Sequence, residues 1–182
     1  MAVKTFTTGE ILTASNTNTY LANAGLVYVT SVTVGNAVSS VTVSNCFTAT
    51  YDSYKILYVN GSASTTSNSI NFNFNGAPAA WYGNLIYANF AAGAPLSAGY
   101  NNTTGINHGG CISSGTPSVC LEVLNPYNAK PSFVQGLYVD GSNAGTVTAS
   151  NANSTSYTGF VLTPASGTLT GGVITVYGYR NA

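Results

Sequence analysis

Charge is what this sequence has least of. Asp, Glu, Lys and Arg make up 4% of the 182 residues and give a formal net charge of zero, whereas roughly 25% is usual in soluble domains. The charged residues lie apart from one another: Lys4, Glu10, Asp52, Lys55, Glu122, Lys130, Asp140 and Arg180. Nucleic acids and anionic membrane surfaces both attract clustered Lys and Arg. The sequence therefore predicts neither partner.

Long apolar runs are also missing. No uninterrupted run approaches the roughly 20 apolar residues of a membrane-spanning helix. The first residues lack the apolar core of a signal peptide. We therefore expect a protein that is made in a cytoplasm.

Cysteine is scarce, with three residues at Cys46, Cys111 and Cys120. A disulfide between Cys111 and Cys120 is one interpretation. The alternative, which we favour in the absence of an export signal, is that the thiols are reduced and buried as small apolar groups.

Histidine occurs once, as His108 in "NHGGC", three residues before Cys111. A nucleophilic thiol needs a base within hydrogen-bond reach and a third group that orients the base, and only Asn107 is adjacent. A zinc site would combine His108 with Cys46, Cys111 and Cys120, but no close Cys pair supports it. We expect no catalysis, no metal and no cofactor here.

Carboxylates are too few to suggest a glycosidase. Two carboxyl groups must lie roughly 5–10 Å apart across the sugar bond, and the candidates are Glu10, Asp52, Glu122 and Asp140. Glu10 lies in the N-terminal segment, and the others fall in different predicted turns or strands. The chain is therefore expected not to be an enzyme.

What the chain does contain is a repeating two-residue period from Leu26 onward. "SINFNFNG" alternates Ile70, Phe72 and Phe74 with asparagines, which is typical of a strand with one apolar face. "LVYVTSVTVGNAVSSVTV" contains two β-branched runs around Gly35-Asn36, which favours a hairpin. The other predicted strands lie at 54–59, 84–90, 118–124, 132–139, 158–163 and 171–180.

About nine or ten short strands favour an all-β fold, an antiparallel sandwich of the jelly-roll kind. The segment between Asn89 and Pro117 is rich in Gly, Ala, Ser and Asn. We interpret most of it as an extended loop.

The N-terminal segment differs from the rest. Thr13 or Ser15 can cap a short helix, and Gly25 stands where a helix C-terminus is expected. About two turns of helix are too short to be stable alone, so the helix must dock. We predict an attachment arm over 1–25 and a β-sandwich domain over 26–182. The apolar side chains expected to be buried by attachment are Phe6, Ile11, Leu12, Tyr20 and Leu21.

Aromatic residues are plentiful: 13 Tyr, 7 Phe and one Trp. Most alternate with aliphatic residues, which indicates rings in the core and hydroxyl groups at its rim. "PAAWYGN" and "YNNTTGINHGG" place aromatics among loop-like residues. Trp81, Tyr82 and Tyr100 are therefore the candidate contacts to a ligand or to a host surface.

Three segments carry a resemblance. "FTTGEILTASNTNTYLANAG" resembles the N-terminal signature of many tailed-bacteriophage virion proteins: an aromatic, Gly-Glu, an aliphatic pair, Thr-Ala, then Asn-Thr-Tyr-Leu. That pattern usually has an acidic and an aliphatic residue where this chain has Asn16 and Thr17. "FTATYDSYKILY" and the closing "GGVITVYGYR" are similar to the β modules that follow the signature. Together these segments cover about a third of the chain.

The resemblance implies a non-enzymatic virion structural protein made in the host cytoplasm. The first hypothesis is a capsid decoration or head-appendage protein that binds virion proteins through its arm and forms a homo-oligomer, most simply a trimer, through its β domain. The alternative is a tail-fibre receptor-binding module that contacts host glycan through loops carrying Trp81 and Tyr100. The sequence does not distinguish head from tail.

Overall fold

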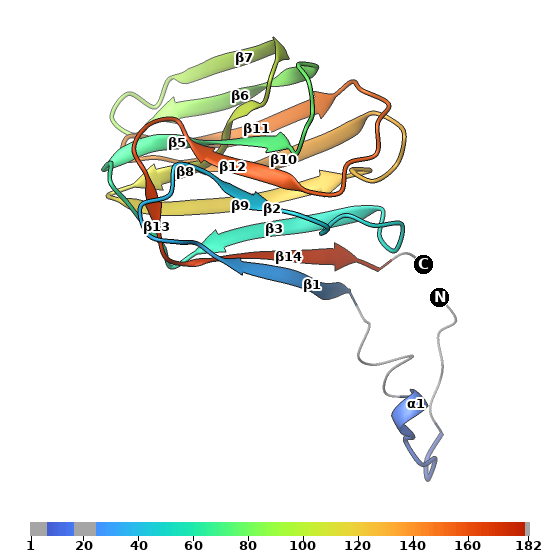
Figure 1. The fold of residues 1–182 in the computed structure, drawn as a ribbon. Coiled ribbons are helices and arrows are strands. Elements are labelled where there is room, and N and C mark those ends of the chain that lie inside the picture. Colours follow the sequence, from blue (N-terminus) through green and yellow to red (C-terminus); the bar gives the residue numbers. More distant parts are fainter. Residues whose placement is uncertain (1–6, 17–24, 181–182) are drawn as a thin grey trace.

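Fourteen β strands and one short helix make up the chain in a computed structural model that describes residues 7–16 and 25–180 (Figure 1). The elements are α1 Ala14–Asn16, β1 Leu26–Thr33, β2 Val41–Val43, β3 Ser53–Val59, β4 Ser62–Ala63, β5 Ser67–Phe74, β6 Trp81–Asn89, β7 Pro95–Thr103, β8 Ile106–Ser113, β9 Thr116–Leu124, β10 Ser132–Val139, β11 Asn143–Asn151, β12 Phe160–Pro164, β13 Leu169–Thr170 and β14 Val173–Tyr179. The antiparallel sandwich expected from the sequence is confirmed.

Eight of these strands have the order of a jelly roll. β1, β14, β3 and β9 are neighbours in one sheet, and β2, β12, β5 and β8 are neighbours in the other. The chain passes from one sheet to the other between β1 and β2, between β2 and β3, and again later, so strands that follow each other in sequence lie in opposite layers. β9 joins the layers, because Thr116–Ser118 pair with β8 whereas Val119–Leu124 pair with β3.

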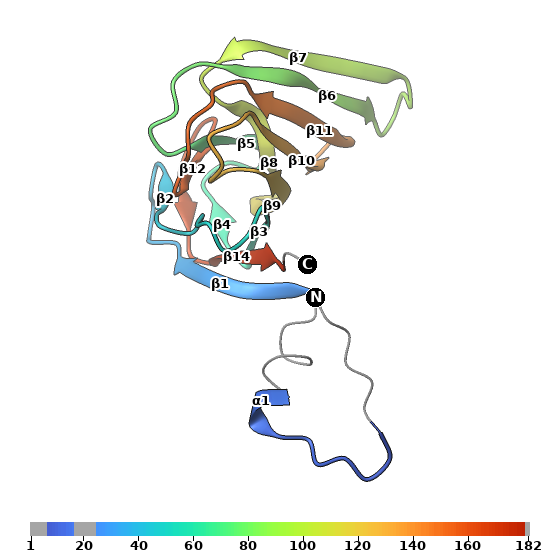
Figure 2. The ribbon, with the colours of Figure 1, turned by 90° about the vertical axis from the view of Figure 1, so that its right-hand side faces the viewer.

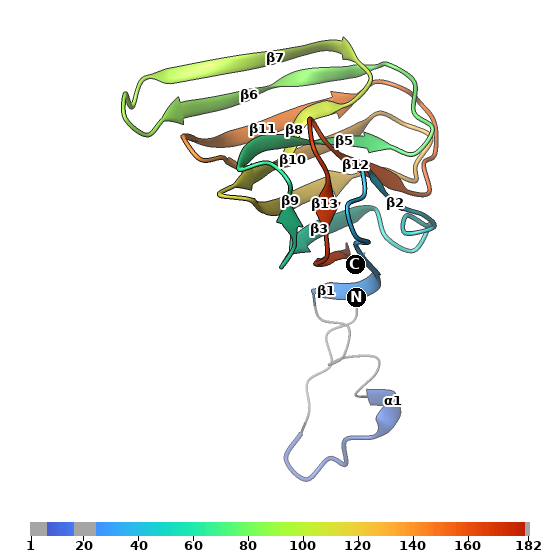
Figure 3. The same ribbon diagram turned by 60° about the vertical axis from the view of Figure 1, so that its left-hand side comes forward.

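Two hairpins enlarge one of the sheets. β10 pairs with β9, β11 with β10, β6 with β11 and β7 with β6. The larger sheet therefore has the order β1-β14-β3-β9-β10-β11-β6-β7. Figures 2 and 3 show β7 at one end of it and β1 at the other. β4 and β13 form a separate two-stranded sheet.

The core lies between the two sheets and is built largely from aromatic rings. Phe72 and Phe74 of β5 are fully buried, as the alternation in "SINFNFNG" predicts. The Phe72 ring stacks on Phe160 at 5.5 Å, and Phe74 stacks on Tyr157 at 4.6 Å. Large buried rings in such contacts supply much of the apolar area that stabilises a sandwich.

The hairpin expected around Gly35-Asn36 is wrong. β1 pairs with β14, and β2 pairs with β12 in the opposite sheet. The segment between them crosses from one layer to the other, with Val38 bridged to Leu169. Period-two alternation identifies a strand and its buried face, but it does not specify which strand becomes the partner.

The long loop expected between Asn89 and Pro117 is also wrong, because this segment forms β7 and β8. β7 is an edge strand beside β6 alone, so it needs few apolar residues. β8 is rich in glycine for a packing reason. A Cβ on Gly109 would meet Phe72, and a Cβ on Gly110 would meet Val119 and the carbonyl of Ser118. Glycine in a strand marks such close approach as well as turns.

The arm is described only in part. α1 covers Ala14–Asn16, and the backbone N–H of Asn16 donates to Thr13 Oγ1 at 3.1 Å. Thr13 is thus the N-cap, one of the two residues expected in that role. The remainder of the predicted helix falls on 17–24, outside the described residues.

Candidate interaction surfaces

Two of the five predicted attachment side chains lie in the described part of the arm. Ile11 is 82% exposed and Leu12 is 50% exposed. Phe6, Tyr20 and Leu21 lie outside the described residues. Within 7–16 no side chain is buried, and α1 has no buried residue. Ile11 and Leu12 therefore present apolar surface that a partner can cover.

Two of the three aromatic contact candidates are corrected by the structure. Trp81 begins β6, is fully buried, and donates from Nε1 to Asn73 Oδ1 at 2.8 Å. Tyr100 lies within β7 and is 5% exposed. Only Tyr82, 42% exposed, can contact a ligand. Gly, Asn and Thr around these rings suggested loops, but they belong to strands that pair with one another.

His108 belongs to a polar cluster at the rim of the core. Tyr100 Oη and His108 Nδ1 are 2.6 Å apart, and the Tyr138 ring meets the His108 ring edge-on at 5.1 Å. Tyr138 donates to Asp140 Oδ2 at 2.8 Å. Asp140 Oδ1 also accepts from the N–H groups of Ser142 and Asn143. The cluster links β7, β8 and β10.

The surroundings change the pKa values of this cluster. Burial lowers the pKa of His108, and the negative charge of Asp140 raises it by less. Burial also raises the pKa values of Tyr100 and Tyr138, so both phenols stay protonated at neutral pH. Burial raises the pKa of Asp140, but its hydrogen bonds outweigh this effect and lower it overall.

We expect His108 to make the protein less stable in mild acid. Its folded pKa is lowered, so between the unfolded value near 6.5 and that lower value the unfolded chain binds the extra proton, and stability falls as the pH falls. The slope is at most about 1.4 kcal/mol per pH unit. Urea unfolding at pH 7.5, 6.5 and 5.5 measures it. His108→Asn keeps a hydrogen-bond acceptor for Tyr100 and should remove the slope, while an unchanged slope would contradict the assignment. Asp140 changes the stability only at pH values below about 3.8, its usual pKa, because its folded pKa is lower still.

The cysteines are all free thiols, so the disulfide interpretation is not supported. Cys46 and Cys111 are buried, and burial raises the pKa of Cys46 to about 12 and raises that of Cys111. Cys120 is half-buried on a sheet surface. In residues 7–16 and 25–180 no three His, Cys, Asp or Glu side chains gather closely enough to hold a metal ion.

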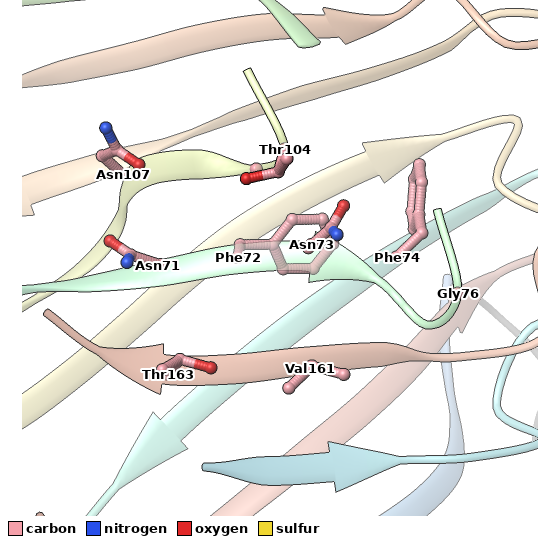
Figure 4. A pocket seen from close by; sticks show the side chains of 10 residues that line it. Asn71, Phe72, Asn73, Phe74, Gly76, Thr104, Asn107, Val161 and Thr163 are labelled. Carbon is pink, nitrogen blue, oxygen red and sulfur yellow. The ribbon is translucent and has the colours of Figure 1, made fainter. Parts of the chain in front are cut away.

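A groove of about 340 Å³ lies on the outer face of the smaller sheet of the sandwich, formed by β2, β12, β5 and β8 (Figure 4). Asn71 and Asn73 on β5 face Val161 and Thr163 on β12 across the strand pair. On the other side of β5 lie Thr104 and Asn107. None of the ten lining residues is charged; five are Phe, Val or Gly, and the other five carry amides or hydroxyls. Such groups both donate and accept hydrogen bonds, so the groove suits a neutral, hydroxyl-rich ligand.

Two of the groove amides are held differently. Asn73 accepts from Trp81 and donates to the Ala77 carbonyl at 3.3 Å, which fixes its side chain. Asn71 Oδ1 is buried and has no hydrogen-bond partner in the described part of the chain. "SINFNFNG" predicted an amide face opposite the apolar one, and this groove is that face.

The outer face of the larger sheet carries exposed apolar side chains that the sequence did not predict, beside polar ones such as Thr146, Thr148 and Ser150 of β11. Its exposed aliphatic and aromatic side chains come from β1, β3, β6, β9 and β10: Leu26, Tyr28, Val59, Tyr82, Ile86, Leu124, Phe133, Leu137 and Val139. Three shallow hollows of about 360, 390 and 410 Å³ lie among them. In "SFVQGLYV" apolar residues occur on both sides of the strand, so the sequence does not show which of them face outward.

One polar row crosses this outer face. Lys55 Nζ and Glu122 Oε1 form an ion pair at 2.8 Å, with the two side chains 27% and 26% exposed. The strand register continues the row from Lys55 to Tyr177 and Tyr28 on one side. On the other side it continues from Glu122 to Gln135, Thr148 and Asn84.

Among the described residues, no helix has the length and apolar character needed to cross a membrane. Comparisons of the chain with protein-family models, with curated proteins and with solved structures find no match.

Proposed function

We propose that this protein is a non-enzymatic structural component of a phage virion, a capsid decoration or head-appendage protein. Its arm binds another virion protein, and its β domain associates with copies of itself, most simply as a trimer. The observation that carries the proposal is the exposure of Ile11 and Leu12 in an arm that buries none of its described side chains. The signature "GEILTA" followed by "NTYL" supports the phage origin.

The arm is tested by changing its exposed apolar side chains in the full chain. Ile11→Ser with Leu12→Ser should weaken binding to purified particles that lack the protein at least about tenfold, because burying one such side chain is worth roughly 1.5–3 kcal/mol. Thr8→Ser, at another exposed arm position, is the matched control. Sedimentation of particles with labelled protein measures binding.

Undiminished binding by the double variant would place the anchor elsewhere. A chain that begins at Leu26 gives a second check, because β1 starts there. We expect it to keep its β-sheet circular dichroism spectrum and to lose particle binding. If it cannot fold, the arm belongs to the sandwich.

The amide groove favours a second candidate function, a receptor-binding module for neutral host glycan. This function no longer depends on Trp81 and Tyr100, which are buried. It would use Asn71, Asn107 and Thr163 on the smaller sheet. In the same reconstitution, particles without the protein should then adsorb poorly to host cells, and normal adsorption would argue against it.

A further inference from the structure

We propose that the outer face of the larger sheet packs against the same face of a second copy of this chain. The inference rests on the self-association of the β domain in the proposed function and names the surface. Because the same face of both copies packs together, the contact is two-fold and gives a dimer in place of the trimer proposed above. It differs from an edge-to-edge contact between strands, because it uses side chains that point outward from the sheet.

The first argument is the amount of exposed apolar surface at the centre of the sheet. Leu137 is 58% exposed, Ile86 57%, Phe133 50% and Leu124 40%. Leu124 of β9 pairs with Phe133 of β10, and Leu137 lies farther along β10. Ile86 of β6 lies two strands from Leu137, beyond Thr146 of β11. A sheet face in water normally carries polar residues, and an extended apolar patch on a soluble chain marks an interaction site.

Charge favours a second copy as the occupant. Of the outward-facing strand residues of the larger sheet, Lys55 and Glu122 are the charged ones, and they neutralise each other at 2.8 Å. A strongly charged partner would find no complementary field on this face. A copy of the chain brings the same pair, so Lys55 of one chain can meet Glu122 of the other in a four-charge network without leaving either sign unpaired.

The polar row is complementary to itself for a second reason. Gln135, Thr148 and Asn84 continue it, and each of these side chains has donors and acceptors. A row of such groups can bond to a copy of itself, whereas a face of carboxylates alone or ammonium groups alone would repel its copy.

The area of the face also matches a self-associating surface. Eight strands leave seven gaps of about 4.8 Å, and strands of seven to nine residues span roughly 25 Å. The face therefore measures about 34 by 25 Å, or roughly 850 Å². Stable protein–protein interfaces bury about 800 Å² on each partner. A contact that covers most of this face would therefore reach the size of a stable interface.

Leu137→Asp tests the face in the full chain, because a carboxylate at the centre of an apolar contact must be desolvated. We expect multi-angle light scattering at about 10 µM, a concentration at which a standard interface is populated, to show an oligomer for the wild type. The variant should elute as the 18.6 kDa monomer.

The matched control is Leu96→Asp. Leu96 is 47% exposed and pairs with Tyr87, between the outward-facing Ile86 and Ala88, so it points to the opposite side of the sheet. This variant should remain oligomeric. A monomeric wild type, or an oligomer that survives Leu137→Asp in folded form, would overturn the inference.

Cys120 provides a second test, which uses the wild-type protein and needs no substitution. It lines the hollow beside Leu137 and is the one thiol of the three that is not buried. In the wild-type oligomer we expect maleimide to modify Cys120 at least about tenfold more slowly than in samples diluted until they dissociate. Equal rates at both concentrations would show that this face stays open, and the inference would fail.

The two proposals fail in different ways. A monomer that still binds particles through its arm contradicts the packing of this face and leaves the attachment function intact. An oligomer that loses its mass with Leu137→Asp but never binds particles supports the face and contradicts attachment.

Discussion

Replacing Trp81 with alanine is expected to lower the free energy of unfolding by about 3–5 kcal/mol, the usual cost of emptying a large aromatic site in a core. Trp81 is fully buried, and its ring lies 5.1 Å from Phe74 and 5.9 Å from Phe72. The change also removes the indole N–H that donates a hydrogen bond to Asn73 Oδ1. Urea unfolding followed by circular dichroism measures the loss.

Two variants calibrate that result. Trp81→Phe keeps most of the ring contacts but leaves Asn73 Oδ1 without its donor, so it should cost about 1–3 kcal/mol. Phe90→Ala removes an aromatic ring that is 60% exposed and should cost less than about 1 kcal/mol. If Trp81→Ala cost no more than Phe90→Ala, Trp81 would not be a core residue.

Gly83→Ala should cost about 3 kcal/mol, near the upper end of ordinary overpacking. A Cβ on Gly83 would meet the carbonyl oxygen of Thr148 and the Cα of Ala149, both backbone atoms of β11. A backbone cannot rotate out of the way as a side chain can, so β6 and β11 must separate. The backbone hydrogen bonds between β6 and β11, which join the two hairpins, would weaken.

Gly99→Ala is the control for that prediction. Gly99 lies one strand away in β7, opposite Asn84, and a Cβ there would meet no atom within 4 Å. The free energy of unfolding of the Gly99→Ala variant should equal that of the wild type or exceed it by about 0.4–1 kcal/mol, because alanine reduces the conformational entropy of the unfolded chain. Equal losses for both variants would contradict the close approach at Gly83.

The fold could be predicted where a strand has one apolar face. "SINFNFNG" lies on β5 with the expected alternation, and the strands predicted at 54–59 and 132–139 lie on β3 and β10. The sequence does not predict β7 and β8, because their residues are determined by something other than an apolar face. β7 lies at an edge, where no second sheet requires apolar side chains, and β8 uses Gly109 and Gly110 to let Phe72 and Val119 approach. A glycine-rich sequence carries no periodicity from which to infer a strand.

The candidate sites were less predictable for a related reason. A single sequence shows that Phe133 and Leu137 alternate with Val134 and Tyr138, but both sets are apolar or aromatic, so either could face the core. Trp81 was placed in a loop because Ala, Gly and Asn flank it. Only the pairing of β6 with β11 and β7 shows which side of each strand is covered.

The position of β14 has a consequence for synthesis on the ribosome. It lies between β1 and β3 in the larger sheet, although it follows every other strand in the sequence. β1 and β3 therefore leave the ribosome early. They cannot pair with β14, the strand between them, until nearly all of the described chain has been translated. Such non-local pairing makes folding slow. Because these strands have few charged residues to discourage premature association, the nascent chain should depend on chaperones more than its size suggests.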